Sequence, residues 1–288
     1  MPSLKEFDTK LTSLKNTQKM TKTMKMVSAS KLRRAQDAQR NAVLYAQHLK
    51  ELIGRLAASV EAVAHPLLTP RSSVKNVLML VITSDRGLCG GFNNNLVKQV
   101  HNWVREKEPA FENVYLSCCG RRGFMYFRTK VDVRTHYEEV TDKPNFVEAG
   151  KISTELAELF VNGEVDEVYM AYNLFKSALR QTPTIAKLLP IEPGEIERQE
   201  KGIALNYILE PAEPELLARL LPKSVNYKIY HALIENSAGE HGARMTAMDS
   251  ATNNADSMID IFTLKRNRAR QAAITTELIE IVAGAEAL

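Results

Sequence analysis

A glycine-rich loop, SDRGLCGGFN at residues 84–93, holds the residue types in this chain that are best suited to chemistry. A loop of this kind between a strand and a helix can bind phosphate through backbone N–H groups at the helix N-terminus. The sequence matches neither G-x-x-x-x-G-K-[ST] nor G-x-G-x-x-G, and the next lysine is Lys98. It therefore also fits a tight turn, in which Asp85 caps a neighbouring segment and Arg86 forms an ion pair or reaches a partner.

Cys89 in the same loop could act as a nucleophile only beside a base, and no histidine lies near it in the sequence. The other cysteines, Cys118 and Cys119, are adjacent, a spacing that suits neither a disulfide nor a zinc site. The six histidines form no cluster with metal-ligand spacing. We therefore expect no catalytic residue, no cofactor and no metal site.

Residues 1–40 carry a strong positive charge, with ten Lys or Arg against three acidic residues, whereas the whole chain has a net charge of +4. Such a segment could bind nucleic acid, anionic lipid or an acidic protein loop, or it could be a solvated helix face. Phe7 is its only aromatic residue, so it lacks the interleaved aromatics of a base-stacking surface. A basic nucleic-acid-binding coiled coil stays open as the alternative to a protein partner.

The elements that must position these residues begin with two long stretches at the ends of the chain. Residues 3–65 and 223–288 contain no proline, and both show apolar side chains at helical spacing. About 60 helical residues would extend roughly 90 Å, too long for burial in one domain. We predict a helix within residues 1–66 and another within 216–288, paired as an antiparallel coiled coil. Gly239 and Gly242 predict a bend or a tight crossing in the second helix.

The middle of the chain, residues 67–215, is typical of an α/β domain. Continuous apolar runs alternate with amphipathic segments, which predicts a mostly parallel, Rossmann-like sheet of about five strands. Residues 131–140 fit a third strand or an irregular edge, and 204–211 could close the sheet. The other expected strands are residues 76–83, 113–120, 166–175 and 182–191, and the expected helices are residues 93–107, 121–129 and 152–165.

Three segments together resemble one family, the gamma subunit of the F1 sector of F-type ATP synthase, in its bacterial form. These are NTQKMTKTMKMVSASKLRRAQ near the start, TSDRGLCGGFNNNL in the middle, and ENSAGEHGARMTAMDSATNNADSMI with RARQAAITTELIEIVAGAEAL at the end. They follow the family's order and spacing, and the similarity covers essentially the whole chain. All three together are far more specific than any one of them.

The resemblance implies a central rotor shaft that couples ion flow through a membrane ring to ATP synthesis or hydrolysis on other subunits. The implied partners are the ring of three alpha and three beta subunits, the epsilon subunit and the ring of c subunits, with no nucleic acid. The chain itself would be non-catalytic. Its first residues lack an apolar signal region, and its longest aliphatic run, Val77–Ile82, is too short to cross a bilayer. We therefore expect a peripheral protein at the cytoplasmic face of a bacterial plasma membrane.

The resemblance also assigns contact residues. The residues implied to face the alpha and beta subunits are Lys22, Met24, Lys25, Arg244, Arg270, Gln271, Thr275 and Glu277. The residues implied in the loop of the foot domain, on the side of the epsilon subunit and the c ring or in a structural role, are Asp85, Arg86 and Cys89. These are expected to be mechanical contacts, with no catalytic role.

Four positions depart from the family pattern. Asp8 stands where a basic residue is usual, and Arg266 stands where an aromatic residue is common. Gly239 and Gly242 replace residues that are more often alanine or similar. These departures affect particular helix contacts.

Overall fold

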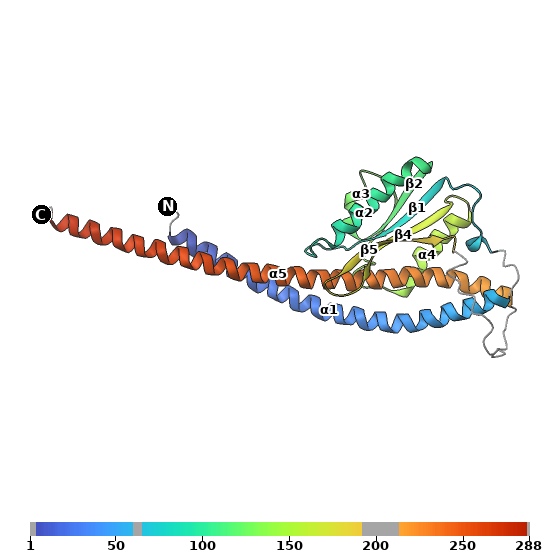
Figure 1. Cartoon of the computed structure of the whole chain (residues 1–288), viewed down its shortest axis with the longest axis horizontal. Helices are drawn as coiled ribbons and strands as arrows, with labels where there is room; N and C mark the ends of the chain where they lie inside the picture. Colours follow the sequence, from blue (N-terminus) through green and yellow to red (C-terminus); the bar gives the residue numbers. More distant parts are fainter. Residues whose placement is uncertain (1–3, 60–64, 192–212, 287–288) are drawn as a thin grey trace. The chain divides into compact units, whose positions relative to one another are not determined.

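The computed structural model describes residues 4–59, 65–191 and 213–286, and it divides the chain into two compact units. One unit consists of residues 1–29 and 244–288, and the other of residues 30–243. Two long helices, α1 (Leu4–Ser59) and α5 (Glu213–Glu286), are present (Figure 1), and both contribute residues to both units. The predicted fold class, long terminal helices with a five-stranded, mostly parallel sheet, is confirmed.

The unit of residues 30–243 is built on a sheet with the strand order β3-β2-β1-β4-β5. Strands β1 to β4 are parallel to their neighbours, and β5 pairs with β4 in the antiparallel direction. The strands are β1 (Asn76–Ile82), β2 (Asn113–Cys119), β3 (Asp132–Tyr137), β4 (Glu167–Phe175) and β5 (Gln181–Leu189). The helices between them are α2 (Phe92–Lys107), α3 (Arg121–Phe127) and α4 (Phe146–Val161), with short 3-10 turns at Pro66–Leu68 and Glu108–Ala110.

Each face of this sheet carries its own apolar core. Residues of α2 and α3 pack on one face, against Met79 and Val81 of β1. Residues of α4 and α5 pack on the other face, against Leu78 and Leu80 of the same strand. Leu49 of α1 joins this second core. Successive residues of β1 therefore point to opposite cores, which explains why its sequence is a continuous apolar run.

Helix α4 begins earlier than the sequence pattern predicts. Its expected range was 152–165, whereas it runs from Phe146 to Val161. The side chain of Asn145 accepts a hydrogen bond from the backbone N–H of Val147 at 2.7 Å and so caps the first turn. The chain leaves the helix at Gly163, which has a φ of 76°.

Helix α5 contains Pro222 within its length. Proline removes one backbone N–H donor and normally breaks a helix. Pro222 is exposed, whereas Leu220, Leu221 and Val225 around it are buried in the core over the sheet. This burial offsets the missing hydrogen bond, so the helix continues through the proline.

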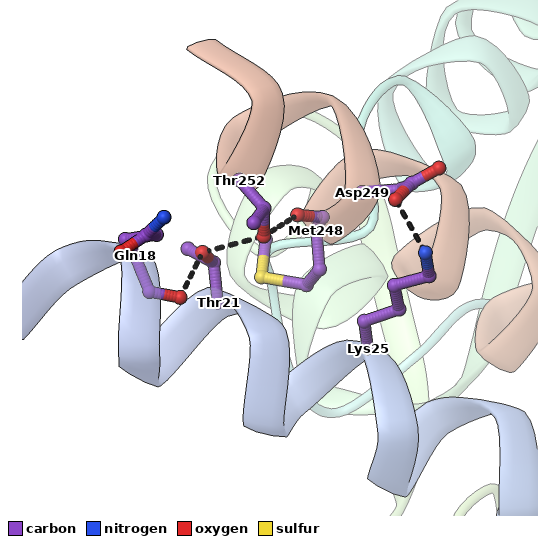
Figure 2. Close-up of polar contacts among 6 residues, drawn as sticks. All are labelled: Gln18, Thr21, Lys25, Met248, Asp249 and Thr252. Atoms are coloured by element: carbon purple, nitrogen blue, oxygen red, sulfur yellow. Dashed lines mark hydrogen bonds and ion pairs between the residues drawn. The ribbon is translucent and has the colours of Figure 1, made fainter. Parts of the chain in front are cut away.

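In the unit of residues 1–29 and 244–288, the two helical segments run antiparallel. Lys25 faces Asp249, and Thr21 faces Thr252 one turn further toward the start of α1 (Figure 2). Phe7 lies near Phe262, with ring centroids 6.4 Å apart. Residue numbers therefore fall along α1 as they rise along α5, as expected for antiparallel helices.

Two predictions about the middle of the chain stay untested. Residues 204–211, expected as a closing strand, lie outside the described residues. The division into segments 1–66, 67–215 and 216–288 also stays a prediction.

Candidate functional site

The glycine-rich loop 84–93 is held by its own side chains. The backbone N–H of Ser84 donates to Asn93 Oδ1 at 3.0 Å, and Asn93 Nδ2 donates to Ser84 Oγ at 2.7 Å. Asp85 accepts from the backbone N–H of Arg121 at 3.0 Å and from Thr141 Oγ1 at 2.7 Å. The loop therefore forms a braced turn that links β1 to the starts of α2 and α3.

Helix α5 occupies the place where a doubly wound sheet usually binds nucleotides. That place is the crevice at the carboxyl ends of the strands where the strand order reverses, here between β1 and β4. Asn236 Nδ2 of α5 donates to the backbone oxygen of Thr83, the residue after β1, at 3.1 Å. Glu235 of α5 accepts from the backbone N–H of Phe175, the last residue of β4, at 2.6 Å.

The first turn of α2, where a phosphate would bind, is covered in the same way. A side chain carbon at Gly239 of α5 would lie only 2.9 Å from Cε2 of Phe92, the first residue of α2. The tight crossing expected at Gly239 is therefore present within this unit. The close packing of α5 on Phe92 therefore takes up space beside the first turn of α2.

The described cysteines offer no nucleophile. Cys89 is buried, and Asn93 Nδ2 donates to its Sγ at 3.3 Å. Burial raises the pKa of the Cys118 thiol to about 12 and also raises the pKa of Cys119. Thiols that stay protonated at neutral pH are inert, so Cys118 and Cys119 serve packing.

On α1, the candidate contact residues lie close to the pairing with α5. Lys25 Nζ forms an ion pair with Asp249 Oδ1 at 2.5 Å, and both side chains remain partly exposed (Figure 2). Lys22 is exposed and Met24 is half-buried. Lys25 therefore has a partner on α5, whereas Lys22 points its charge toward solvent.

On α5, the candidate residues differ in exposure. Arg244 is buried, whereas Arg270, Gln271 and Glu277 are exposed. Thr275 Oγ1 is also exposed and donates to the backbone oxygen of Gln271 at 2.9 Å.

The final turns of α5 also carry exposed apolar side chains. Ile281 is 67% exposed and Val282 is 57% exposed, values that are unusual for aliphatic residues in a folded protein. Ile274, Leu278 and Ile279 are exposed as well. This stretch therefore has an apolar surface that no other described residue covers.

The eight candidate residues expected to face the alpha and beta subunits all belong to the unit of residues 1–29 and 244–288. Asp85, Arg86 and Cys89 belong to the other unit. Two polar residues that the sequence pattern did not single out also form contacts: Asp249 pairs with Lys25, and Glu235 of α5 accepts from the last residue of β4. The first contact depends on the register of the helix pair and the second on the position of α5 on the sheet, and only the three-dimensional structure supplies these.

Comparison with known proteins gives a match along nearly the whole chain. The family model described as ATP synthase matches residues 3–288. The ATP synthase gamma chain of Trichlorobacter lovleyi is 45% identical over 289 residues, covering 100% of this chain and 99% of that protein. The ATP synthase gamma chain of Anaeromyxobacter sp. strain Fw109-5 is 46% identical over 292 residues, covering 100% of each. The chain belongs to the ATP synthase gamma-chain family.

The fold agrees with this membership. The chain is similar to a chain in the Tetrahymena thermophila mitochondrial ATP synthase central stalk and c-ring, with a TM-score of 0.61 and 23% identity, covering 81% of this chain and 99% of that one. It is also similar to a chain in the Euglena gracilis mitochondrial ATP synthase OSCP/F1/c-ring structure, with a TM-score of 0.67 and 18% identity, covering 99% and 94%. The predicted family and the predicted function as a gamma chain are confirmed, and the nucleic-acid-binding alternative has no support.

Asp8 and Arg266, which the sequence analysis singled out, lie opposite each other. Arg266 Nη1 is 3.6 Å from Asp8 Oδ1, and the Arg266 side chain is partly exposed whereas that of Asp8 is exposed. Ion pairs open to solvent contribute little, about 0–1 kcal/mol. The two residues therefore place opposite charges side by side within the helix pair.

Gly242 of α5 lies against a turn of the α/β domain. A side chain carbon there would lie 3.1 Å from the Cα of Ala178 and 3.5 Å from Cε2 of Phe175. Like Gly239, this residue lets the gamma chain bring α5 close to the sheet. Among the helices within residues 4–59, 65–191 and 213–286, none has the length and apolar character needed to cross a bilayer.

Proposed function

We propose that this gamma chain is the central rotor shaft of a bacterial ATP synthase and that it catalyses no reaction itself. In this role it turns inside a ring of three alpha and three beta subunits, and the beta subunits carry the catalytic sites. The observation that carries the proposal is the match along the whole chain to gamma chains at 45% identity.

The exposed apolar end of α5 supports a partner that surrounds it. Exposed aliphatic side chains in a contiguous stretch mark an interaction surface in soluble proteins. An enclosing ring of subunits would remove these side chains from water, and it would bring Arg270, Gln271, Thr275 and Glu277 next to polar groups of the ring. The apolar side chains then form a bearing, and the polar ones form contacts that favour particular angles.

The physics of rotation follows from symmetry. A single chain has no threefold axis, so it cannot make equal contacts with three identical beta subunits. At each angle it binds their conformations with different free energies, and the subunit that binds best changes as the shaft turns. Because this linkage is reciprocal, ATP hydrolysis can drive rotation and rotation can drive ATP synthesis.

The basic side of α1 supports a second set of contacts. In this role Lys22, Met24 and Lys25 would meet acidic loops of the beta subunits, and Arg244 of α5 would contact the same ring. Lys22 is exposed, so its charge can approach an acidic loop. Met24 can adapt to a moving partner surface because its side chain is flexible.

The unit of residues 30–243 serves as the foot in this proposal. It would bind the epsilon subunit and the ring of c subunits, and Asp85, Arg86 and Cys89 belong to its braced loop. The complex would lie at the cytoplasmic face of the plasma membrane, with this chain attached through the c ring. Coupling then requires only that the foot and the helices turn together.

A reconstitution tests the proposal. The chain is mixed with alpha and beta subunits, the complex is isolated, and its ATPase rate is compared with that of the chain alone. We expect an inert chain and an active complex. Changing Arg270→Ala and Gln271→Ala together removes two polar contacts, and we expect a loss of about tenfold in rate, since each contact contributes about 0.5–1.5 kcal/mol.

The matched control changes an arginine and a glutamine that are equally exposed on α2, Arg105→Ala with Gln99→Ala. This control is expected to leave the rate unchanged. ATP hydrolysis by the chain alone, or failure of the chain to enter the complex, would overturn the proposal. An equal loss in both double variants would show that α5 makes no special contact.

A further inference from the structure

Glu235 is a buried carboxylate that contacts two other elements of its unit. Its side chain is only 4% exposed. One oxygen, Oε2, accepts from the backbone N–H of Phe175 at the end of β4, at 2.6 Å. The other oxygen, Oε1, accepts from Nε2 of Gln39 on α1. One side chain of α5 therefore binds both the sheet and the other long helix.

Burial of the Glu235 carboxylate carries a cost in desolvation free energy. Burying a carboxylate costs several kcal/mol unless hydrogen bonds replace its water. His231 Nε2, on a partly exposed side chain, lies 3.7 Å from Oε1 of Glu235. Burial, and secondarily the charge of Glu235, raises the pKa of Tyr172. An apolar residue would fill this position at a lower desolvation cost. Glutamate differs from such a residue because it accepts two hydrogen bonds with defined directions.

Directional contacts matter here because apolar packing does not fix a helix along or around its axis. Leu233 and Ile234, the two residues of α5 that precede Glu235, are buried in the apolar core over the sheet. Burial of this kind is favourable in many registers, since the hydrophobic effect has no direction. Hydrogen bonds to Phe175 and Gln39, with that of Asn236 to the backbone of Thr83, select one register.

We infer that Glu235 is a positioning residue that locks the helix segments of residues 30–243 to the sheet, so that torque on the helices turns the α/β domain without slip. The inference rests on the proposed rotor function and adds the residue through which the torque passes. Lys31 of α1, whose Nζ lies 2.9 Å from Asp142 Oδ1 before α4, provides a weaker second link because both side chains are about one-third exposed.

An exchange of the two side chains tests this role. Glu235→Gln keeps the shape but removes the charge, so the hydrogen bond from Phe175 becomes a neutral one and Gln39 must turn its amide oxygen toward residue 235. The double variant Gln39→Glu with Glu235→Gln restores a charged acceptor facing an amide donor at the same place, and it has the same net charge as the natural chain. Each variant is assembled with the full complex in lipid vesicles, where ATP hydrolysis and ATP-driven ion pumping are measured together.

We expect Glu235→Gln to lower the number of ions pumped per ATP hydrolysed by about twofold or more, while hydrolysis changes less, because neutral hydrogen bonds are roughly half as strong as bonds to a carboxylate and so permit slip. The exchange variant is expected to restore pumping per ATP. Glu158→Gln, on the exposed face of α4, is the matched control and should have no effect. A probe fixed to the α/β domain should also show a wider spread of pause angles in Glu235→Gln.

Three outcomes would overturn the inference. In Glu235→Gln, the rates of hydrolysis and pumping could fall in parallel, or neither rate could change. The third outcome is that the exchange variant does not restore pumping per ATP. Where Glu235→Gln does not assemble, Glu235→Asp replaces it, because aspartate keeps the charge but is one methylene too short to reach both donors. Full pumping per ATP in Glu235→Asp would also overturn it. Failure of the rotor proposal gives a different result, since the natural chain would then support no pumping.

Discussion

Gly239 sets how closely α5 approaches the start of α2. A side chain carbon at this position would lie 2.9 Å from Cε2 of Phe92 and 3.3 Å from Cγ of Gln181. The ring of Phe92 is itself buried, so it has little room to move. In an exposed helix alanine would be better than glycine by about 1 kcal/mol, so packing reverses the usual preference here.

Gly239→Ala is therefore expected to lower the free energy of unfolding of the subunit by about 1–3 kcal/mol. Urea unfolding of the natural and changed chains measures this difference. Phe92→Leu in the same chain makes room for the added carbon, so the two changes together should cost less than their sum. A more stable Gly239→Ala chain would contradict the close packing of α5 on α2.

The pairing of α1 with α5 in residues 1–29 and 244–288 depends on a ladder of polar contacts. Thr21 is buried, and its Oγ1 lies 2.7 Å from Oγ1 of Thr252 (Figure 2). Thr252 also donates to the backbone oxygen of Met248 at 2.7 Å. Gln18 donates to Asp256 further along the pair. These contacts define the register where the apolar pattern alone is too irregular to do so.

Thr21→Cys with Thr252→Cys is expected to form a disulfide on mild oxidation, because the two side chains meet directly. The bond should raise the free energy of unfolding by about 2–4 kcal/mol. Since both residues belong to the same chain, the oxidised complex should still turn and keep its ATPase rate. Gel mobility without reducing agent and the ATPase rate are the measurements.

The control for this cross-link is Thr23→Cys with Thr252→Cys. Thr23 is exposed and donates to the backbone oxygen of Lys19, so its side chain points away from the pairing. This pair is expected to stay reduced. Equal oxidation of both cysteine pairs would contradict the register in which Thr21 of α1 faces Thr252 of α5.

As a whole molecule, the isolated chain carries an apolar surface that its own described residues leave open. Ile281 and Val282 of α5 are more than half exposed. We expect the isolated chain to self-associate through this stretch. Ile281→Ser with Val282→Ser should weaken that association by about tenfold or more, since each aliphatic side chain contributes roughly 1.5–3 kcal/mol when buried.

Sedimentation over a range of concentrations measures this self-association. Leu179 is the matched control, because it is 81% exposed but isolated at the turn between β4 and β5. Leu179→Ser should leave the association unchanged. If Leu179→Ser dissociates the chain as effectively as the double change in α5, the apolar end is not the contact surface.

The sequence by itself determined the elements and the family. Continuous apolar runs such as residues 76–83 and the long helical stretches at both ends depend on local periodicity, which a single chain displays directly. The family followed from three motifs in fixed order. Helix α4 begins before its predicted start because Asn145 caps its first turn, and the apolar pattern used for the prediction does not include this local signal.

The tertiary structure alone decided where α5 lies on the sheet. Gln39 and Glu235 are 196 positions apart, and Asn236 and Thr83 are 153 positions apart, so no local pattern relates them. The glycines at 239 and 242 predicted a bend or a close approach, and only the positions of Phe92 and Ala178 show that the approach is close. These long-range hydrogen bonds and close approaches form only where α5 packs on the sheet. They contribute to stability only after the apolar core between α5 and the sheet has formed.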